Sequence, residues 1–121
     1  MGISGKPFKH RSGRVSVLDK FGFIGKFKTV PGSKDALVGI LLEAAEGAEA
    51  IEGCEQYIIH VSDEEPDAVW VTEIWRDKDS HAASLQLPET AALIGKAKPL
   101  IAGVESTRLR SLGGKGFPAD G

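Results

Sequence analysis

The sequence predicts an α+β protein with a ferredoxin-like fold, in which one four-stranded antiparallel sheet carries its helices on a single face. Segments with the pattern of a β-strand occur at residues 21–30, 54–62, 68–75 and 105–112. Segments with a helical period fall between the first and second of these strands and between the third and fourth. This alternation of elements is that of the split β-α-β arrangement.

Length and composition fit one ordinary globular domain. The chain has 121 residues, of which 41% are hydrophobic and 26% are charged. Its net charge of −2 gives no indication of a nucleic-acid or membrane partner. A single cysteine, Cys54, excludes an intrachain disulfide, and the sequence has no apolar run long enough to span a bilayer. We therefore expect a cytoplasmic protein.

The two ends of the chain differ in composition from the predicted domain at residues 21–112. Residues 1–20 form a basic arm whose charged residues are Lys6, Lys9, Arg11, Arg14, Asp19 and Lys20. This arm is either native or a vector-derived leader, and residues 15–18 could add a short edge strand. Residues 113–121 begin Gly-Gly-Lys-Gly and are expected to be a flexible tail.

The first predicted strand alternates three phenylalanines onto one face, namely Phe21, Phe23 and Phe27. Gly25 lies between them and marks a bulge, a close approach by a ligand or backbone, or simple packing space under a helix. Pro-Gly at residues 31–32 ends the strand, and Ser33 is expected to cap the next helix through its hydroxyl. That helix is predicted over residues 34–50, with an apolar stripe of Leu37, Ile40, Leu41, Ala44 and Ala48.

Two strands joined by an acidic hairpin come next, at residues 54–62 and 68–75. Residues 63–67, Asp-Glu-Glu-Pro-Asp, are typical of a hairpin connection. The third strand places Glu73 and Trp75 on one face, and both of its faces are largely apolar. A small sheet with helices on one side should expose a polar second face. We therefore expect a second subunit to cover that face.

Asp77 follows the third strand and can cap a helix that carries His81 and Ser84. Pro88 then starts a further helix at its first turn, where a missing N–H does no harm. We expect this helix to run over residues 89–103 and to be kinked or split at its internal proline. The last strand, residues 105–112, places Arg108 and Arg110 on one face.

Several short motifs stand in the same order as in a known family. They are Pro31-Gly32 after the first strand, Gly53-Cys54 at the second, Glu73-x-Trp75 ending the third, and Ala82-Ala83 in the helix after an acidic turn. Over about residues 21–112 the chain thus resembles the antibiotic biosynthesis monooxygenase family and, within it, the quinol monooxygenases. The Glu-x-Trp motif with its turn and helix is fairly specific for the fold and much less specific for the reaction.

The resemblance implies a homodimer whose two sheets pack face to face as a dimeric α/β barrel. Some members oxidise quinols or anthrone-like polycyclic aromatics with O₂, using no metal, flavin or haem, in a pocket between the sheet and the helices. Other members bind and degrade haem, and others have no demonstrated activity. Haem-degrading members need an asparagine from the first strand, and this chain contains no asparagine. The resemblance therefore points to a small aromatic substrate and O₂, without a cofactor.

A cofactor-free oxygenase needs a base that converts its substrate into an electron-rich anion, and a histidine has the appropriate pKa. The chain offers His10, His60 and His81. His10 belongs to the arm and His60 is expected near the hairpin, so we assign the base to His81. Members of the family often carry a histidine further along this helix, where the present sequence has Ser84. The alternative is that His81 only caps or packs.

Five further residues complete the predicted site. Glu73 could act as a second base if burial raises its pKa, or it could form an ion pair with Arg108 or Arg110. We assign substrate contacts to Trp75, Tyr57, His60 and Ser84. Trp75 offers a flat wall for an aromatic ring or fills the core, and Tyr57 binds a substrate oxygen or packs.

No metal site is predicted, because the histidines are far apart in sequence and no His/Cys cluster occurs. Cys54 has no neighbour that would lower its pKa, so we interpret it as a packing residue. Two functions remain open from the sequence. The first is a cofactor-independent monooxygenase that acts on a hydroxylated aromatic. The second is a non-catalytic dimeric barrel that binds a small apolar ligand or serves as an assembly partner.

Overall fold

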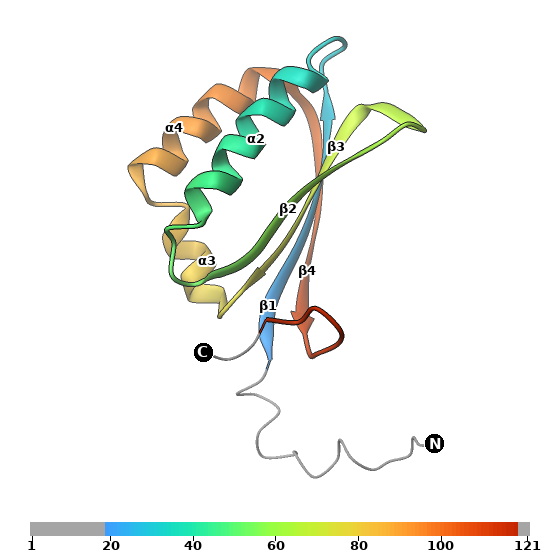
Figure 1. Cartoon of the computed structure of the whole chain (residues 1–121). Coiled ribbons are helices and arrows are strands. Elements are labelled where there is room, and N and C mark those ends of the chain that lie inside the picture. Colours follow the sequence, from blue (N-terminus) through green and yellow to red (C-terminus); the bar gives the residue numbers. More distant parts are fainter. Residues whose placement is uncertain (1–18, 119–121) are drawn as a thin grey trace, which may run out of the picture.

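The computed structural model describes residues 19–118, so most of the predicted basic arm, including His10, lies outside the described residues. The elements are β1 (Lys20–Thr29), α2 (Lys34–Ala48), β2 (Cys54–Ser62), β3 (Glu65–Trp75), α3 (Lys78–Ser84), α4 (Pro88–Ala97), the 3₁₀ helix η2 (Lys98–Leu100) and β4 (Ile101–Ser111). The strands form one antiparallel sheet in the order β2-β3-β1-β4. Figure 1 shows α2 and α4 side by side on one face of this sheet. The predicted ferredoxin-like fold is confirmed.

The core lies between this face of the sheet and the two long helices. Leu37 and Leu41 of α2 pack with Val69 of β3 and Ala97 of α4. Leu37 and Val69 are fully buried. Burying an aliphatic side chain of this size stabilises a fold by about 1.5–3 kcal/mol, so this apolar contact holds α2 on the sheet.

The first strand has the predicted alternation, and Gly25 provides packing space. A Cβ built on Gly25 would lie 3.2 Å from both the Phe23 ring and a Val71 methyl group. The irregularity in the pairing of β1 with β4 falls at Lys28 and Thr29, not at Gly25. Of the three interpretations of this glycine, the structure supports close packing on the helix-facing side of the sheet.

The predicted hydroxyl cap of α2 is wrong. Ser33 holds the N-cap position, but its side chain makes no capping hydrogen bond, and its carbonyl accepts from the Leu37 N–H at 3.0 Å. Its backbone, with φ −103° and ψ 4°, is not in the β region from which a serine hydroxyl normally caps. The helix also ends at Ala48, two residues before the predicted end.

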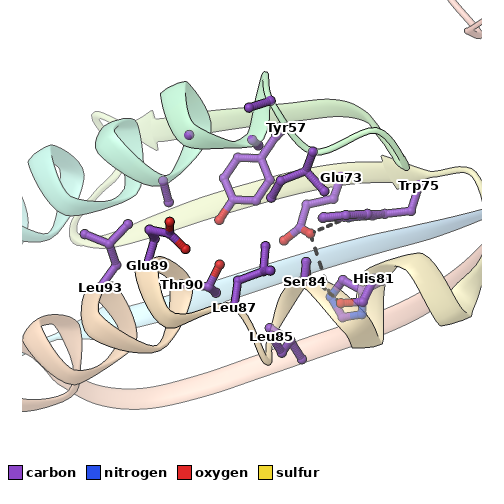
Figure 2. Close-up of a pocket in the computed structure, with 15 residues that line it drawn as sticks. Tyr57, Glu73, Trp75, His81, Ser84, Leu85, Leu87, Glu89, Thr90 and Leu93 are labelled. Carbon is purple, nitrogen blue, oxygen red and sulfur yellow. Dashed lines mark hydrogen bonds and ion pairs between the residues drawn. The ribbon is translucent and has the colours of Figure 1, made fainter.

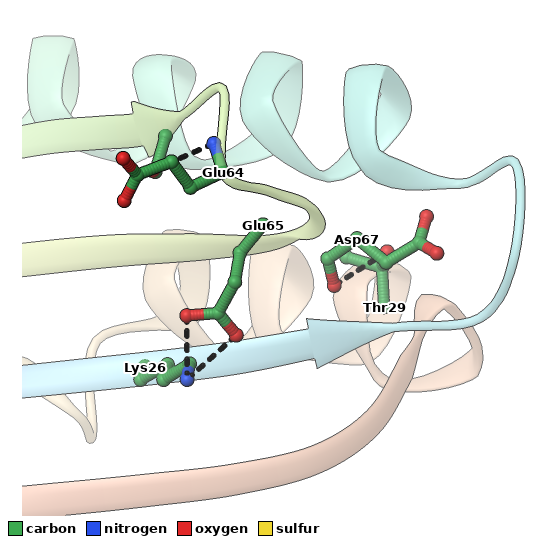
Figure 3. Close-up of polar contacts among 6 residues, drawn as sticks. Lys26, Thr29, Glu64, Glu65 and Asp67 are labelled. Atoms are coloured by element: carbon green, nitrogen blue, oxygen red, sulfur yellow. Dashed lines mark hydrogen bonds and ion pairs between the residues drawn. The ribbon is translucent and has the colours of Figure 1, made fainter.

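The hairpin between β2 and β3 is tighter than predicted. Only residues 63–64 separate the strands, because β3 begins at Glu65 rather than at residue 68. The Glu64 N–H donates to Ser62 Oγ at 3.1 Å, and Lys26 Nζ forms an ion pair with Glu65 at 2.9 Å, as Figure 3 shows. Thr29 Oγ1 also donates to the Asp67 carbonyl at 3.2 Å. These contacts join the start of β3 to β1 and extend the strand into the predicted loop.

In the second half of the domain, both helices begin where the sequence predicts, but the last helix ends earlier than predicted. Asp77 caps α3, since its Oδ1 accepts from the Ser80 N–H at 2.7 Å, and Pro88 begins α4. The helix predicted over residues 89–103 instead stops at Ala97, and β4 starts at Ile101 rather than at residue 105. Pro99 lacks an N–H and cannot continue an α-helix, so the chain tightens into η2 and then extends.

Residues 113–118, predicted to start a flexible tail, contact the sheet near the beginning of β1 and β2 (Figure 1). Gln56 Nε2 donates to the Gly116 carbonyl at 2.8 Å, and Lys20 Nζ lies 5.7 Å from the centre of the Phe117 ring. The glycines permit the required turn, since Gly116 has φ +85°.

The sheet face opposite the helices is partly apolar, as the sequence predicts. Ile24, Ile58 and Leu109 lie on it, and each is about 40% exposed or more. Homodimerisation through this face remains a prediction. Within residues 19–118, none of the helices has the length and hydropathy needed to traverse a lipid bilayer.

Candidate functional site

A cavity of about 490 Å³ lies between the sheet and the three helices (Figure 2). Its walls are mainly apolar and come from α2, β2, β3, α3, α4 and the segments that join them. A neighbouring cavity of about 430 Å³ extends it along the sheet toward β4. Both are lined by Tyr57, Glu73 and His81, so these residues stand where the two spaces meet.

The polar centre of the site is Glu73, in β3, which is one of the two central strands of the sheet. Its pairing partners are Tyr57 on β2 and Phe23 on β1, and Phe23 pairs in turn with Arg108 on β4. These four residues form one row across the helix-facing side of the sheet. Antiparallel pairing with the observed register therefore brings together residues from four distant parts of the sequence.

Glu73 is buried and makes two contacts through Oε1. The Trp75 indole N–H donates to it at 2.7 Å, and His81 Nε2 lies 3.8 Å away (Figure 2). Burial raises the pKa of the Glu73 carboxyl to about 7, although the hydrogen bond from Trp75 opposes that rise. Near neutral pH, Glu73 therefore exists in both its protonated and its charged form.

His81 is fixed by aromatic rings on three sides. Its ring centre lies 5.0 Å from that of Phe21, 5.4 Å from that of Phe23, and 5.4 Å from that of Trp75, which it meets edge-on. Burial lowers the pKa of His81, and the positive charge of Arg108 lowers it further. A lowered pKa leaves the imidazole neutral at pH 7, which is the form that accepts a proton.

The two pKa shifts explain why a histidine beside a carboxyl is not stabilised as an imidazolium. Because the pKa of His81 is lowered and that of Glu73 is raised to about 7, Glu73 is mostly protonated and carries little negative charge where His81 titrates. Above pH 7, Glu73 is mostly charged and His81 is neutral. Glu73 therefore gains or loses its proton near neutral pH, where general acid–base catalysis is most effective.

Three of the remaining predicted residues line the cavity, and the fourth lies on the other face of the sheet. Tyr57 directs its ring and hydroxyl into the cavity, where burial raises its pKa and keeps the hydroxyl protonated (Figure 2). Ser84 lines the cavity but donates its hydroxyl to the His81 carbonyl at 2.7 Å. Trp75 is 2% exposed and is both a cavity wall and a core residue. His60 lies on the opposite sheet face, where its Nε2 is 2.9 Å from Thr72 Oγ1.

The proposed ion pair between Glu73 and a β4 arginine is wrong. Among the described residues, the ion-pair contact of Glu73 is with His81. Arg110 instead pairs with Asp19 at 3.2 Å, near the start of β1. Arg108 lies in the same row as Glu73 but one strand beyond Phe23, at the side of the cavity that β4 bounds.

Cys54 is half-buried and its thiol lies 3.7 Å from the Gln56 carbonyl. Burial, together with the nearby charges of Glu73 and Glu55, raises the pKa of this thiol to about 11, so it is a poor nucleophile. Between residues 19 and 118, no group of three or more His, Cys, Asp or Glu side chains is arranged to hold a metal ion.

The helix that carries His81 rests on a residue without a side chain. Gly53 lies against Ser80, and a Cβ built on Gly53 would overlap the Ser80 side chain. The Gly53 carbonyl also accepts from the Arg76 N–H at 2.7 Å. Together with the Asp77 cap, these contacts fix the start of α3 against the turn before β2.

Sequence reasoning missed the contribution of α4 and β4 to the cavity. Glu89, Thr90 and Leu93 line the first cavity from α4, and Arg108 lines the neighbouring cavity from β4. Arg108 carried a usable signal, because a last strand beside the first in this topology places every second residue of β4 over the same sheet face.

The comparison with known sequences decides the family. The sequence model of the antibiotic biosynthesis monooxygenase family matches residues 21–96. The chain belongs to this family. No functionally curated protein matches the sequence. The family match ends before β4, although β4 is part of the same sheet.

Solved structures support the same assignment. A candidate antibiotic biosynthesis monooxygenase from Chloroflexus aurantiacus is 40% identical, with 81% of this chain and 98% of that chain covered and a TM-score of 0.74. A Pseudomonas aeruginosa protein is 21% identical over 80% of this chain and 98% of its own, with a TM-score of 0.73. A further candidate family member from Deinococcus radiodurans is 20% identical over 84% and 99%, with a TM-score of 0.69. The last two show a shared fold.

Proposed function

We propose that this family member is a cofactor-independent monooxygenase that oxidises a hydroxylated aromatic, such as a quinol or an anthrone-like compound, with O₂. The observation that carries this proposal is the Glu73–His81 pair, which faces a mainly apolar cavity of about 490 Å³. An apolar cavity with a few convergent polar groups of shifted pKa is typical of a small-molecule site.

The first step is proton removal from the substrate. Neutral His81 takes a proton from a hydroxyl, or from the acidic carbon of an anthrone, and becomes an imidazolium beside Glu73. The charged form of Glu73, 3.8 Å from Nε2, stabilises that imidazolium. The hydroxyl of Tyr57, which burial keeps protonated, can donate to a substrate oxygen across the cavity.

The second step is the reaction of the substrate anion with O₂. Two electrons of the substrate form a carbon–oxygen bond and give a hydroperoxide after proton transfer. Loss of water from the hydroperoxide breaks the O–O bond and leaves a carbonyl, so one oxygen atom enters the product and the other leaves as water. The imidazolium of His81 supplies the proton that converts the peroxide anion into the hydroperoxide, and His81 returns to its neutral form. Neutral His81 can then take the hydrogen of the oxygen-bearing carbon as a proton and pass it to the departing hydroxide, which leaves as water.

The test is oxygen consumption by the purified protein with a panel of quinols and anthrones, measured against spontaneous oxidation. We expect uptake above that rate, and we expect His81→Gln to reduce it by about 10²-fold or more. His60→Gln is the matched variant, because it removes the same side chain from the opposite sheet face.

Uptake that survives His81→Gln would remove His81 from the role of base and leave Glu73 as the group to test. If no compound is consumed but aromatics bind in the cavity, the non-catalytic binding barrel would replace the oxygenase. Circular dichroism and urea unfolding of each variant establish that a lost rate is not a lost fold.

We also propose that the protein is a homodimer in the cytoplasm, with the partly apolar outer face of the sheet as its interface. The exposed Ile24, Ile58 and Leu109 support this, since an exposed apolar patch on a small sheet is typical of an interface.

A further inference from the structure

We propose that Arg108 makes the cavity selective for hydroxylated aromatics that also carry a carboxylate. This inference rests on the proposed function and names the substrate class for the same site. It assigns Arg108 as a specificity residue that binds the substituent, while His81 and Glu73 act on the hydroxyl.

Arg108 lies in the same row as the reactive pair. The row runs Tyr57, Glu73, Phe23, Arg108 across β2, β3, β1 and β4. Since neighbouring strands are about 4.8 Å apart, the backbone of Arg108 is on the order of 10 Å from that of Glu73. Arg108 lines the neighbouring cavity of about 430 Å³ on the β4 side, and this cavity shares Tyr57, Glu73 and His81 with the first. A fused-ring aromatic can therefore place a hydroxyl at His81 and a carboxylate at Arg108.

The charge balance of this part of the cavity favours an anion. Lys98 and Arg108 line it, and among its described lining residues Glu73 is the one carboxyl group. Glu73 is protonated in part at neutral pH, so it cannot neutralise both cations. Most of the other lining residues are apolar, including Phe23, Phe27 and Ile101.

Arg108 also differs from the arginine two residues further along β4. Arg110 forms an ion pair with Asp19 at 3.2 Å. Within residues 19–118, no carboxylate forms an ion pair with Arg108, although its charge acts on His81. An arginine with a free planar fork at the edge of an apolar cavity is suited to bidentate binding of a carboxylate.

The experiment measures binding without turnover. Two probes share one ring system: 6-hydroxy-2-naphthoate carries a carboxylate on the ring opposite its hydroxyl, and 2-naphthol lacks the carboxylate. Their dissociation constants are measured by isothermal titration calorimetry for the unaltered protein and for the variants Arg108→Gln, Arg108→Lys and Arg110→Gln. Arg110→Gln is the matched control, because it removes the same charge from the same strand at a position that does not line the cavity.

We expect the unaltered protein to bind the carboxylated probe about ten-fold or more tightly than 2-naphthol, since a hydrogen bond to a charged group has about this effect. Arg108→Gln should abolish the preference, Arg108→Lys should restore part of it, and Arg110→Gln should retain it. Because Arg108 is exposed to solvent, the preference should also weaken with added salt.

Equal affinity for both probes in the unaltered protein, or a preference that survives Arg108→Gln, would overturn the carboxylate assignment and leave the proposed oxidation standing. Binding of neither probe would overturn the assignment together with the cavity's role as an aromatic site. Oxygen uptake by the unaltered protein with an uncharged quinol tests the oxidation by itself.

Discussion

Trp75 donates its indole N–H to Glu73 at 2.7 Å, although the two residues are only two positions apart on the same face of β3. Both side chains are buried, so the Glu-x-Trp motif supplies its own hydrogen-bond partner to a carboxyl that would otherwise lie in apolar surroundings. The motif therefore stabilises the fold whether or not the protein catalyses a reaction.

Replacing Trp75 by Phe should keep most of the ring packing and remove the donor. We expect a loss of about 1–3 kcal/mol in the free energy of unfolding, because a buried carboxyl oxygen loses its partner. Urea unfolding followed by circular dichroism measures this. Trp70→Phe is the control, since Trp70 pairs with Lys26 and lies on the outer sheet face. Equal losses of unfolding free energy in both variants would show that the hydrogen bond from Trp75 to Glu73 adds no measurable stability.

Glu73→Gln should change how stability depends on pH. The pKa of Glu73 is about 7 in the folded protein against a reference value of 4.5, so the folded state holds a proton that the unfolded state has lost between these values. This contribution is complete below pH 4.5 and disappears as the pH rises through 7. Between pH 5 and pH 8 the unaltered protein should therefore lose about 2–3 kcal/mol relative to Glu73→Gln.

Urea unfolding of both proteins at several pH values between 5 and 8 tests this difference. Glu55→Gln is not a suitable comparison, because Glu55 forms an ion pair with Lys20 at 2.8 Å. Glu89→Gln is suitable, since Glu89 also lines the cavity but lies on α4. Parallel stability curves for the unaltered protein and Glu73→Gln would contradict the raised pKa.

Arg108→Gln should raise the pKa of His81. The positive charge of Arg108 disfavours the imidazolium, and its removal makes protonation easier. The acid limb of kcat/KM, which reports loss of the neutral base, should then move to higher pH. Titration of the His81 ring by NMR measures the same shift directly, and Arg110→Gln should leave it in place because Arg110 pairs with Asp19.

Ile58→Glu should prevent homodimerisation. Ile58 is 46% exposed on the outer sheet face, and a charge there would be buried without a partner in a face-to-face dimer. Light scattering coupled to size-exclusion chromatography should report a dimer for the unaltered protein and a monomer for the variant. Leu42→Glu is the control, because Leu42 is 53% exposed on α2. A dimer that tolerates Ile58→Glu would place the interface elsewhere.

The order of elements and the faces of the strands were predictable because they depend on local periodicity. The buried set Val69, Val71, Glu73 and Trp75 matches the face assigned from the alternation of β3. The errors concern the ends of elements, which local periodicity does not determine. The break at Pro99 was predicted, but the chain does not resume the helix to residue 103 after it and enters β4 instead. Contacts of Lys26 with Glu65 accompany the extension of β3 into a stretch whose composition is typical of a loop.

The site was predictable only in part. His81 and Glu73 could be placed near each other because the strand end and the next helix are adjacent in sequence. Arg108 is 27 positions from His81 and enters through the register of β4 with β1, which a single sequence does not specify. His60 shows the opposite case, since its chemistry is suitable but strand alternation turns it to the outer face.

Gly53 makes no contact with the cavity, yet it limits which sequences can keep the reactive pair together. Since a Cβ there would overlap the Ser80 side chain, we expect a substitution to displace α3 and so to change the position of His81 relative to Glu73. In a random-mutagenesis screen, position 53 should therefore tolerate few substitutions although it does not line the cavity. A tolerance map of this chain would then mark a turn before β2 together with the residues of the candidate site.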